Sequence, residues 1–135
     1  MRICIMITLG CFIAITVVGQ KYTSSSIFAH NDYAQENPFY RAYSFRVGYI
    51  EADIFLIEGE LMVAHHRNEI QKERTLGALY LTPLKNEIIK NKNWAYPDTT
   101  LRLSLMIDLK TEGMSTLRKL VDELDACPEL SSGRN

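Results

Sequence analysis

Residues 49–56, YIEADIFL, alternate apolar and acidic side chains, a pattern that fits a β-strand with two unlike faces. The apolar residues would share the face that packs on a core, and Glu51 and Asp53 would share the opposite face. Two neighbouring carboxylates are costly to bury unless a positive charge neutralises them. The strand therefore predicts a positively charged group close to Glu51 and Asp53. The alternative is that each acid simply faces solvent.

Length and composition are those of an ordinary globular domain. The chain has 135 residues, of which 47% are hydrophobic and 23% charged, which argues against disorder and fits about one domain. The net charge is −1 and there is no tract rich in lysine and arginine. Composition therefore gives no electrostatic case for a nucleic-acid partner.

The first twenty residues have the layout of a secretory signal peptide. A positive charge at Arg2 precedes an apolar run at residues 3–18 and the small residue Gly19. We expect a signal peptide at residues 1–19 and a secreted or periplasmic product; an uncleaved membrane anchor is the alternative. Cleavage would leave Cys127 as the single cysteine, which excludes an intrachain disulfide and a cysteine zinc site in the mature chain.

Patterns of strands and helices alternate along the rest of the chain. We expect a first strand at residues 24–30 and then a helix with Asn37 as N-cap and Pro38 at its first position. After the strand at 49–56, Glu58, Gly59 and Glu60 suggest a turn into a hairpin partner that ends at His65.

The second half of the chain continues this alternation. Thr75 and Thr82 are candidate caps for a short helix and for a helix at residues 83–91. A strand is expected at residues 101–110, with its odd-numbered leucines and Ile107 on one face. The last helix would carry an apolar stripe: Leu117, Leu120, Val121 and Leu124. The alternation predicts an α/β fold in which helical crossovers join parallel strands.

Polar residues cluster near the ends of the predicted strands, where active sites of parallel α/β folds lie. They are His30, Glu51, Asp53, Asp108 and Lys110. Three carboxylates on adjacent strands suit Mg²⁺ or Ca²⁺, and imidazoles titrate near neutrality and serve as general acid and base. A metal between acids, flanked by His30 and His65, would suit phosphodiester cleavage. The alternatives are loop histidines and an Asp108–Lys110 pair.

The segments AHNDY, IEADIFLIEGELMVAH and LMIDLK together resemble the glycerophosphodiester phosphodiesterase-like group of the phospholipase C-like phosphodiesterase superfamily. Within it, AHNDY and TLGALYLTPL are most similar to the branch that includes fungal altered inheritance of mitochondria protein 6 and its bacterial relatives. The resemblance covers residues 27–110. It implies a TIM (β/α)₈ barrel, of which this chain would supply the N-terminal part.

The resemblance also implies a role for each matching residue. His30 and His65 match the catalytic histidines, with His65 preferred over His66 because it ends the apolar strand MVAH. Asn31 and Lys110 match substrate-binding positions near the phosphate. The implied metal ligands, usually for Mg²⁺ or Ca²⁺, are Glu51, Asp53 and Asp108.

Two departures from the family pattern affect these expectations. His30-Asn31-Asp32 stands where His-Arg-Gly is usual, so the arginine near the phosphate is missing. The family barrel has about 250 residues and eight strands, whereas residues 24–127 would supply roughly three, followed by a tail at 128–135. We therefore expect a truncated barrel domain.

The function that follows is a metal-dependent phosphoric diester hydrolase. Its substrates would be small glycerophosphodiesters or phospholipid-like diesters, the latter implying peripheral membrane contact. The alternative is a catalytically inactive remnant that at most binds a divalent metal. The sequence does not determine an oligomeric state.

Overall fold

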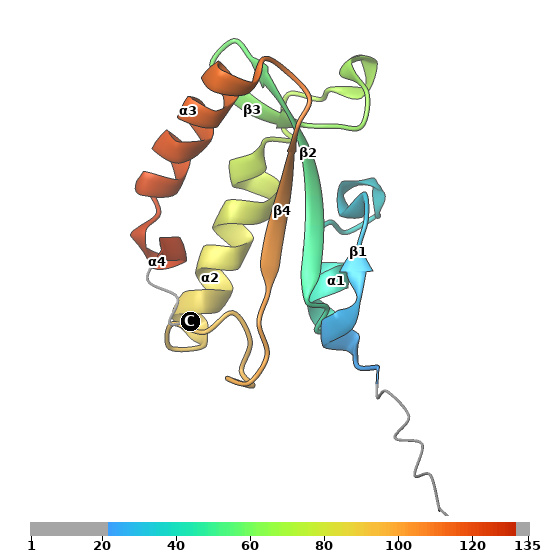
Figure 1. The fold of residues 1–135 in the computed structure, drawn as a ribbon, viewed down its shortest axis with the longest axis vertical. Helices are drawn as coiled ribbons and strands as arrows, with labels where there is room; N and C mark the ends of the chain where they lie inside the picture. Colours follow the sequence, from blue (N-terminus) through green and yellow to red (C-terminus); the bar gives the residue numbers. More distant parts are fainter. Residues whose placement is uncertain (1–21, 132–135) are drawn as a thin grey trace, which may run out of the picture.

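The computed structural model describes residues 22–131, so the expected signal peptide and cleavage site lie outside the described residues. The fold is a small mixed sheet packed against helices (Figure 1). Its strands are β1 Phe28–Ala29, β2 Tyr49–Ile57, β3 Glu60–Val63 and β4 Ser104–Leu109. Its α-helices are α1 Tyr40–Ser44, α2 Thr82–Lys90, α3 Gly113–Asp125 and α4 Pro128–Ser131. None of the helices between residues 22 and 131 has the length and apolarity needed to cross a membrane.

The long strand β2 organises the sheet. It pairs in parallel with β1 and β4, and its second half pairs antiparallel with β3, the predicted hairpin partner. Helical segments lie between β1 and β2 and, after the hairpin strand β3, between β3 and β4 (Figure 1), which confirms the predicted α/β class with parallel strands. The β2–β4 register places Asp53 directly opposite Asp108.

The two faces of β2 differ as the alternating sequence predicts. Ile50, Ala52 and Ile54 are fully buried and join a core cluster that includes Leu76 and Tyr80 from the helical layer. The opposite face carries the two acids. Burial of the apolar face holds β2 in a register that directs its acids to the other side.

The first strand and the first helix are shorter than expected. Residues Ser24–Ser26 form a 3₁₀ turn, so only Phe28 and Ala29 pair with β2. The predicted helix start at Pro38 with an Asn37 cap is wrong, because α1 begins at Tyr40. The backbone N–H of Phe39 donates to the Asp32 carboxylate at 2.6 Å, and Phe39 adopts a positive φ of 61°. This tertiary contact delays the start of the helix.

Differences also occur in the second half of the chain. The predicted cap at Thr82 is wrong, because the π-helical segment Gly77–Leu81 runs directly into α2. Thr75 does act as a cap, accepting a hydrogen bond from the Ala78 backbone N–H at 3.1 Å. β4 starts at Ser104 rather than at residue 101. Residues Pro128–Ser131 of the expected tail form the short helix α4.

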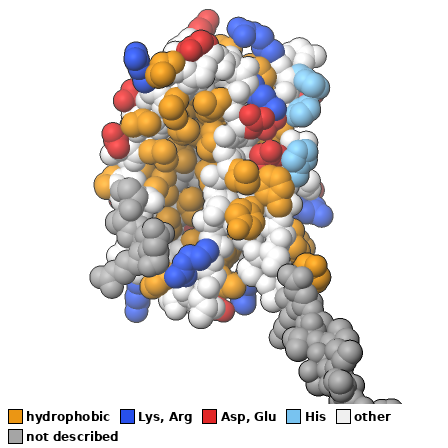
Figure 2. Space-filling model, viewed as in Figure 1, with side chains coloured by type: hydrophobic (Ala, Val, Ile, Leu, Met, Phe, Trp, Pro, Cys, Tyr) orange, Lys and Arg blue, Asp and Glu red, His pale blue; other side chains and the backbone are white. Residues whose placement is uncertain are grey.

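The apolar stripe of α3 is only partly buried. Leu120 is 8% exposed, but Leu117, Val121 and Leu124 remain 38–46% exposed. Figure 2 shows hydrophobic side chains along this part of the surface. The stripe therefore follows the predicted spacing, yet within residues 22–131 no element covers most of it.

Gly48 is required by a close approach between backbones. A Cβ at this position would lie 1.9 Å from the backbone oxygen of Ser25, whereas a Cβ at Gly113 would meet nothing within 4 Å. We expect Gly48→Ala to lower the free energy of unfolding by about 2 kcal/mol, as overpacking does. Gly113→Ala is the matched control and should leave it within about 1 kcal/mol of wild type. Thermal denaturation compares the two; equal melting temperatures would contradict this role of Gly48.

Candidate active site

The predicted site residues gather at the carboxyl end of the parallel strands. His30 directly follows β1, Glu51 and Asp53 lie in β2, and Asp108 lies near the end of β4. Because paired residues of parallel strands point to the same side, Asp53 and Asp108 share a face. Figure 2 shows histidine, acidic and basic side chains grouped in this region.

Asp53 is the hub of the site. It is 1% exposed, and its Oδ2 lies 2.8 Å from the Tyr33 hydroxyl, 3.2 Å from His65 Nδ1 and 3.0 Å from Lys110 Nζ. Burial alone raises the pKa of Asp53, but hydrogen bonds from Lys110, Tyr33 and His65 outweigh it and hold the pKa below its ordinary value. Asp53 is therefore a buried, ionised acceptor.

Lys110 supplies the positive charge that the acidic strand predicts. Its Nζ lies 2.6 Å from Asp108 Oδ2 and 3.0 Å from Asp53 Oδ2, so one ammonium group bridges both carboxylates. Hydrogen bonds to Asp108 and Asp53 raise the pKa of Lys110. The Asp108–Lys110 pair left open by the sequence is thus present, and it extends to Asp53.

The three predicted metal ligands have protein partners in this arrangement. Within residues 22–131, no group of three histidine, cysteine, aspartate or glutamate side chains is positioned to hold one. Lys110 occupies Asp53 and Asp108, so an ion would have to displace its ammonium group from them. Glu51, the third predicted ligand, is engaged elsewhere.

Glu51 holds the loop that follows β1. Its Oε2 accepts a hydrogen bond from the Asn31 backbone N–H at 2.9 Å and lies 3.4 Å from His30 Nε2. Asn31 adopts a left-handed conformation with φ of 51°, and its side-chain oxygen lies 2.6 Å from the Tyr33 hydroxyl. The backbone N–H and the side-chain oxygen of Asn31, a predicted substrate-binding residue, therefore already have protein partners.

The two adjacent histidines have different surroundings. His65 contacts Asp53 and Tyr33 through Nδ1, at 3.2 and 3.1 Å. The rings of His65 and His66 are 4.4 Å apart, but the His66 backbone N–H donates to Glu69 at the start of a 3₁₀ turn. The structure thus brings His65, the preferred residue of the pair, into contact with the acidic face.

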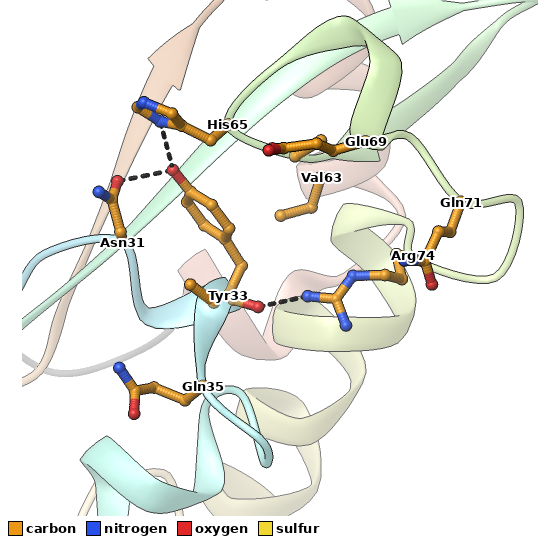
Figure 3. Close-up of a pocket in the computed structure, with 10 residues that line it drawn as sticks. Asn31, Tyr33, Gln35, Val63, His65, Glu69, Gln71 and Arg74 are labelled. Carbon is orange, nitrogen blue, oxygen red and sulfur yellow. Dashed lines mark hydrogen bonds between the residues drawn. The ribbon is translucent and has the colours of Figure 1, made fainter.

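Three residues without a predicted role also shape the site: Asp32, Tyr33 and Arg74. Asp32 is 2% exposed and accepts hydrogen bonds from the Phe39 backbone and the Tyr80 hydroxyl, at 2.6 and 3.1 Å. Arg74 donates to the backbone carbonyl of Tyr33 (Figure 3). Tyr33 and Arg74 also line an adjacent cavity of about 530 Å³. The signal available in the sequence was the polar run HNDY directly after a strand.

Asp32 gives stability a pH dependence whose sign follows from its pKa. Burial raises the pKa of Asp32 above 3.8, and this effect exceeds that of the hydrogen bonds from Phe39 and Tyr80, which lower the pKa. Above 3.8 the unfolded chain releases this proton while the folded protein keeps it, so stability falls as pH rises until the folded pKa is passed. As pH rises through this window, the free energy of unfolding of wild type should therefore fall relative to that of Asp32→Asn. Denaturant titrations at several pH values measure it, and a constant difference would contradict the prediction.

The segment that contains the site residues is similar to known proteins. The model of the AIM6-like phosphodiesterase domain family matches residues 16–131, which include every candidate site residue. The chain belongs to this family. It is 34% identical over 117 residues to an altered inheritance of mitochondria protein 6 homolog from Arthroderma benhamiae, covering 73% of this chain and 37% of the relative.

A second relative agrees with this assignment. Altered inheritance of mitochondria protein 6 from Lachancea thermotolerans is 30% identical over 122 residues, covering 79% of this chain and 28% of the relative. The AIM6-like chain thus spans well under half the length of these two relatives. No solved structure gave a significant match.

Proposed function

We propose that this AIM6-like chain carries the acidic and histidine part of a phosphoric diester hydrolase site. The observation that supports this most is the grouping of His30, Glu51, Asp53, His65 and Lys110 on one face at the carboxyl end of the parallel strands. The chain also belongs to a phosphodiesterase domain family. Its sheet would form the first strands of a (β/α)₈ barrel whose interior is the face that carries the acids.

The chemistry proposed is proton transfer by the two histidines. One imidazole would deprotonate the attacking hydroxyl or water, and the other would protonate the departing alkoxide. His65 suits the first role because Asp53 holds its Nδ1 and leaves Nε2 for the proton. The ammonium group of Lys110 would stabilise negative charge that develops on the phosphoryl oxygens.

We propose small glycerophosphodiesters or phospholipid-like diesters as substrates, in a secreted or periplasmic location. We also propose that the site binds a divalent cation, Mg²⁺ or Ca²⁺, on one condition. Lys110 would have to release Asp53 and Asp108 before these carboxylates could bind an ion. No proton-transfer step above depends on the ion.

Hydrolysis of bis(p-nitrophenyl) phosphate by the purified chain tests the function. We expect turnover that falls about 10²-fold or more in Glu51→Gln and His30→Ala. Lys85→Gln is a control, since Lys85 pairs with Glu129 away from the site. Unchanged rates in both site variants would refute the assignment. Addition of a chelator, with hydrolysis as the readout, tests the cation separately.

The second candidate is a catalytically inactive domain that at most binds a cation. The contacts of Lys110 favour it, because this side chain already neutralises two of the three predicted ligands. A folded chain that shows no hydrolysis of any phosphodiester would select this candidate.

A further inference from the structure

The hydroxyl of Tyr33 lies at the centre of the site, within hydrogen-bond distance of three site residues. The side chain is 5% exposed, and the hydroxyl oxygen lies 2.8 Å from Asp53 Oδ2 and 3.1 Å from His65 Nδ1. It also lies 2.6 Å from the side-chain oxygen of Asn31. Figure 3 shows the hydroxyl directed at Asn31 and His65.

The loop that carries Tyr33 is anchored on both sides. Asp32, the preceding residue, is buried and hydrogen-bonded to Phe39 and Tyr80. Arg74 holds the Tyr33 carbonyl, and Asn31 is tied to Glu51 through its backbone N–H. Because these anchors fix the backbone, the hydroxyl has little freedom to leave its partners.

The partners of His65 Nδ1 indicate which ring nitrogen carries the proton. Oδ2 of Asp53 faces the Lys110 ammonium group at 3.0 Å and the Tyr33 hydroxyl at 2.8 Å, so this oxygen acts as an acceptor. The single proton of the Tyr33 hydroxyl goes to Asp53 or to the Asn31 oxygen. His65 Nδ1 lies 3.2 Å from the acceptor oxygen Oδ2 of Asp53, so we infer that it carries the proton that is donated to Asp53. In that tautomer Nε2 keeps its lone pair.

We propose that Tyr33 is a positioning residue that, together with Asp53, holds His65 in the Nδ1–H tautomer and fixes the direction of its free Nε2. This inference rests on the proposed hydrolase function only for its effect on rate. Tyr33 acts through His65 and takes no proton from substrate.

The test removes the hydroxyl alone, with Tyr33→Phe in the full chain. The control is Tyr96→Phe, since Tyr96 is 1% exposed and its hydroxyl donates to the Val47 carbonyl at 2.7 Å, away from the site. Imidazole nitrogen chemical shifts report the tautomer directly. We expect a single His65 tautomer in wild type and Tyr96→Phe, and a shift toward a mixture in Tyr33→Phe.

The second part of the test measures the kinetic effect of Tyr33→Phe in the wild-type protein and in His65→Ala. We expect Tyr33→Phe to lower kcat for bis(p-nitrophenyl) phosphate by about tenfold or more, with KM within about twofold. In a His65→Ala background the same substitution should have no further effect on kcat, because its target is gone. Unchanged His65 shifts in Tyr33→Phe, or an equal loss of rate in both backgrounds, would overturn the proposal. If wild type shows no hydrolysis, the chemical shifts alone decide the role of Tyr33, and the proposed function fails separately.

Discussion

Replacing His65 with alanine is expected to lower the rate of phosphodiester hydrolysis by about 10²–10⁴-fold. His65 is the imidazole that Asp53 and Tyr33 hold, with 3.2 and 3.1 Å contacts to Nδ1. Removing it leaves the proposed site without the base that Nε2 supplies. The side chain is 46% exposed, so the fold should survive the substitution. Initial rates with a chromogenic phosphodiester measure the loss, and circular dichroism checks the fold.

His66→Ala is the matched control, because the same atoms are removed one residue away. The His66 ring lies beside that of His65, but its described hydrogen bonds are with Glu69 and not with the acids of β2 and β4. We expect this variant to keep hydrolysis within a few-fold of wild type. A larger loss in His66→Ala than in His65→Ala would reverse the assignment of the two residues.

Lys110→Met is expected to destabilise the folded protein by about 3 kcal/mol at neutral pH, because it leaves a buried carboxylate without its cation. Asp53 has 2% side-chain exposure, and the nearby Asp108 loses the same partner. We further expect Mg²⁺ or Ca²⁺ to raise the melting temperature of this variant more than that of wild type. The cation would then meet no competing ammonium group.

Lys90→Met is the control for charge removal. Lys90 is 71% exposed and pairs with Glu87 on α2, so its loss should cost less than about 1 kcal/mol. Scanning calorimetry with and without each cation compares the variants. Equal stability of Lys110→Met and wild type, with no response to either cation, would contradict the neutralising role of Lys110.

The α/β class and the central strand could be predicted because both depend on local alternation. In β2 the apolar residues at 50, 52 and 54 need one buried face, and this requirement alone directs Glu51 and Asp53 to the other side. The helix α3 and the hairpin of β2 and β3 follow from equally local patterns.

What the sequence could not predict depends on contacts that lie outside any single helix or strand. The start of α1 at Tyr40 is set by a hydrogen bond between Phe39 and Asp32, not by a cap within the helix. Likewise, the bridging position of Lys110 requires the β2–β4 register that sets Asp53 opposite Asp108. A cation was expected at this place, but spacing alone does not distinguish an ammonium group from a metal ion.

The hydroxyl of Tyr33 is the clearest example of such a contact. It meets Asp53 and His65, which follow it by 20 and 32 residues along the chain. No periodicity marks an aromatic residue in a loop as the partner of a histidine. The resemblance to a known family pointed to His65 and Asp53, but it named no residue that holds them together.

Mapping where a phosphodiester binds tests most directly whether the acidic face is the active site. Dimethyl phosphate, a slowly hydrolysed diester, is titrated into isotope-labelled protein, and the amide resonances are followed by NMR. We expect the largest shifts at His30, His65 and Lys110, with little change in α3. Shifts confined to other surfaces, with these three residues unmoved in a folded protein, would contradict the assignment.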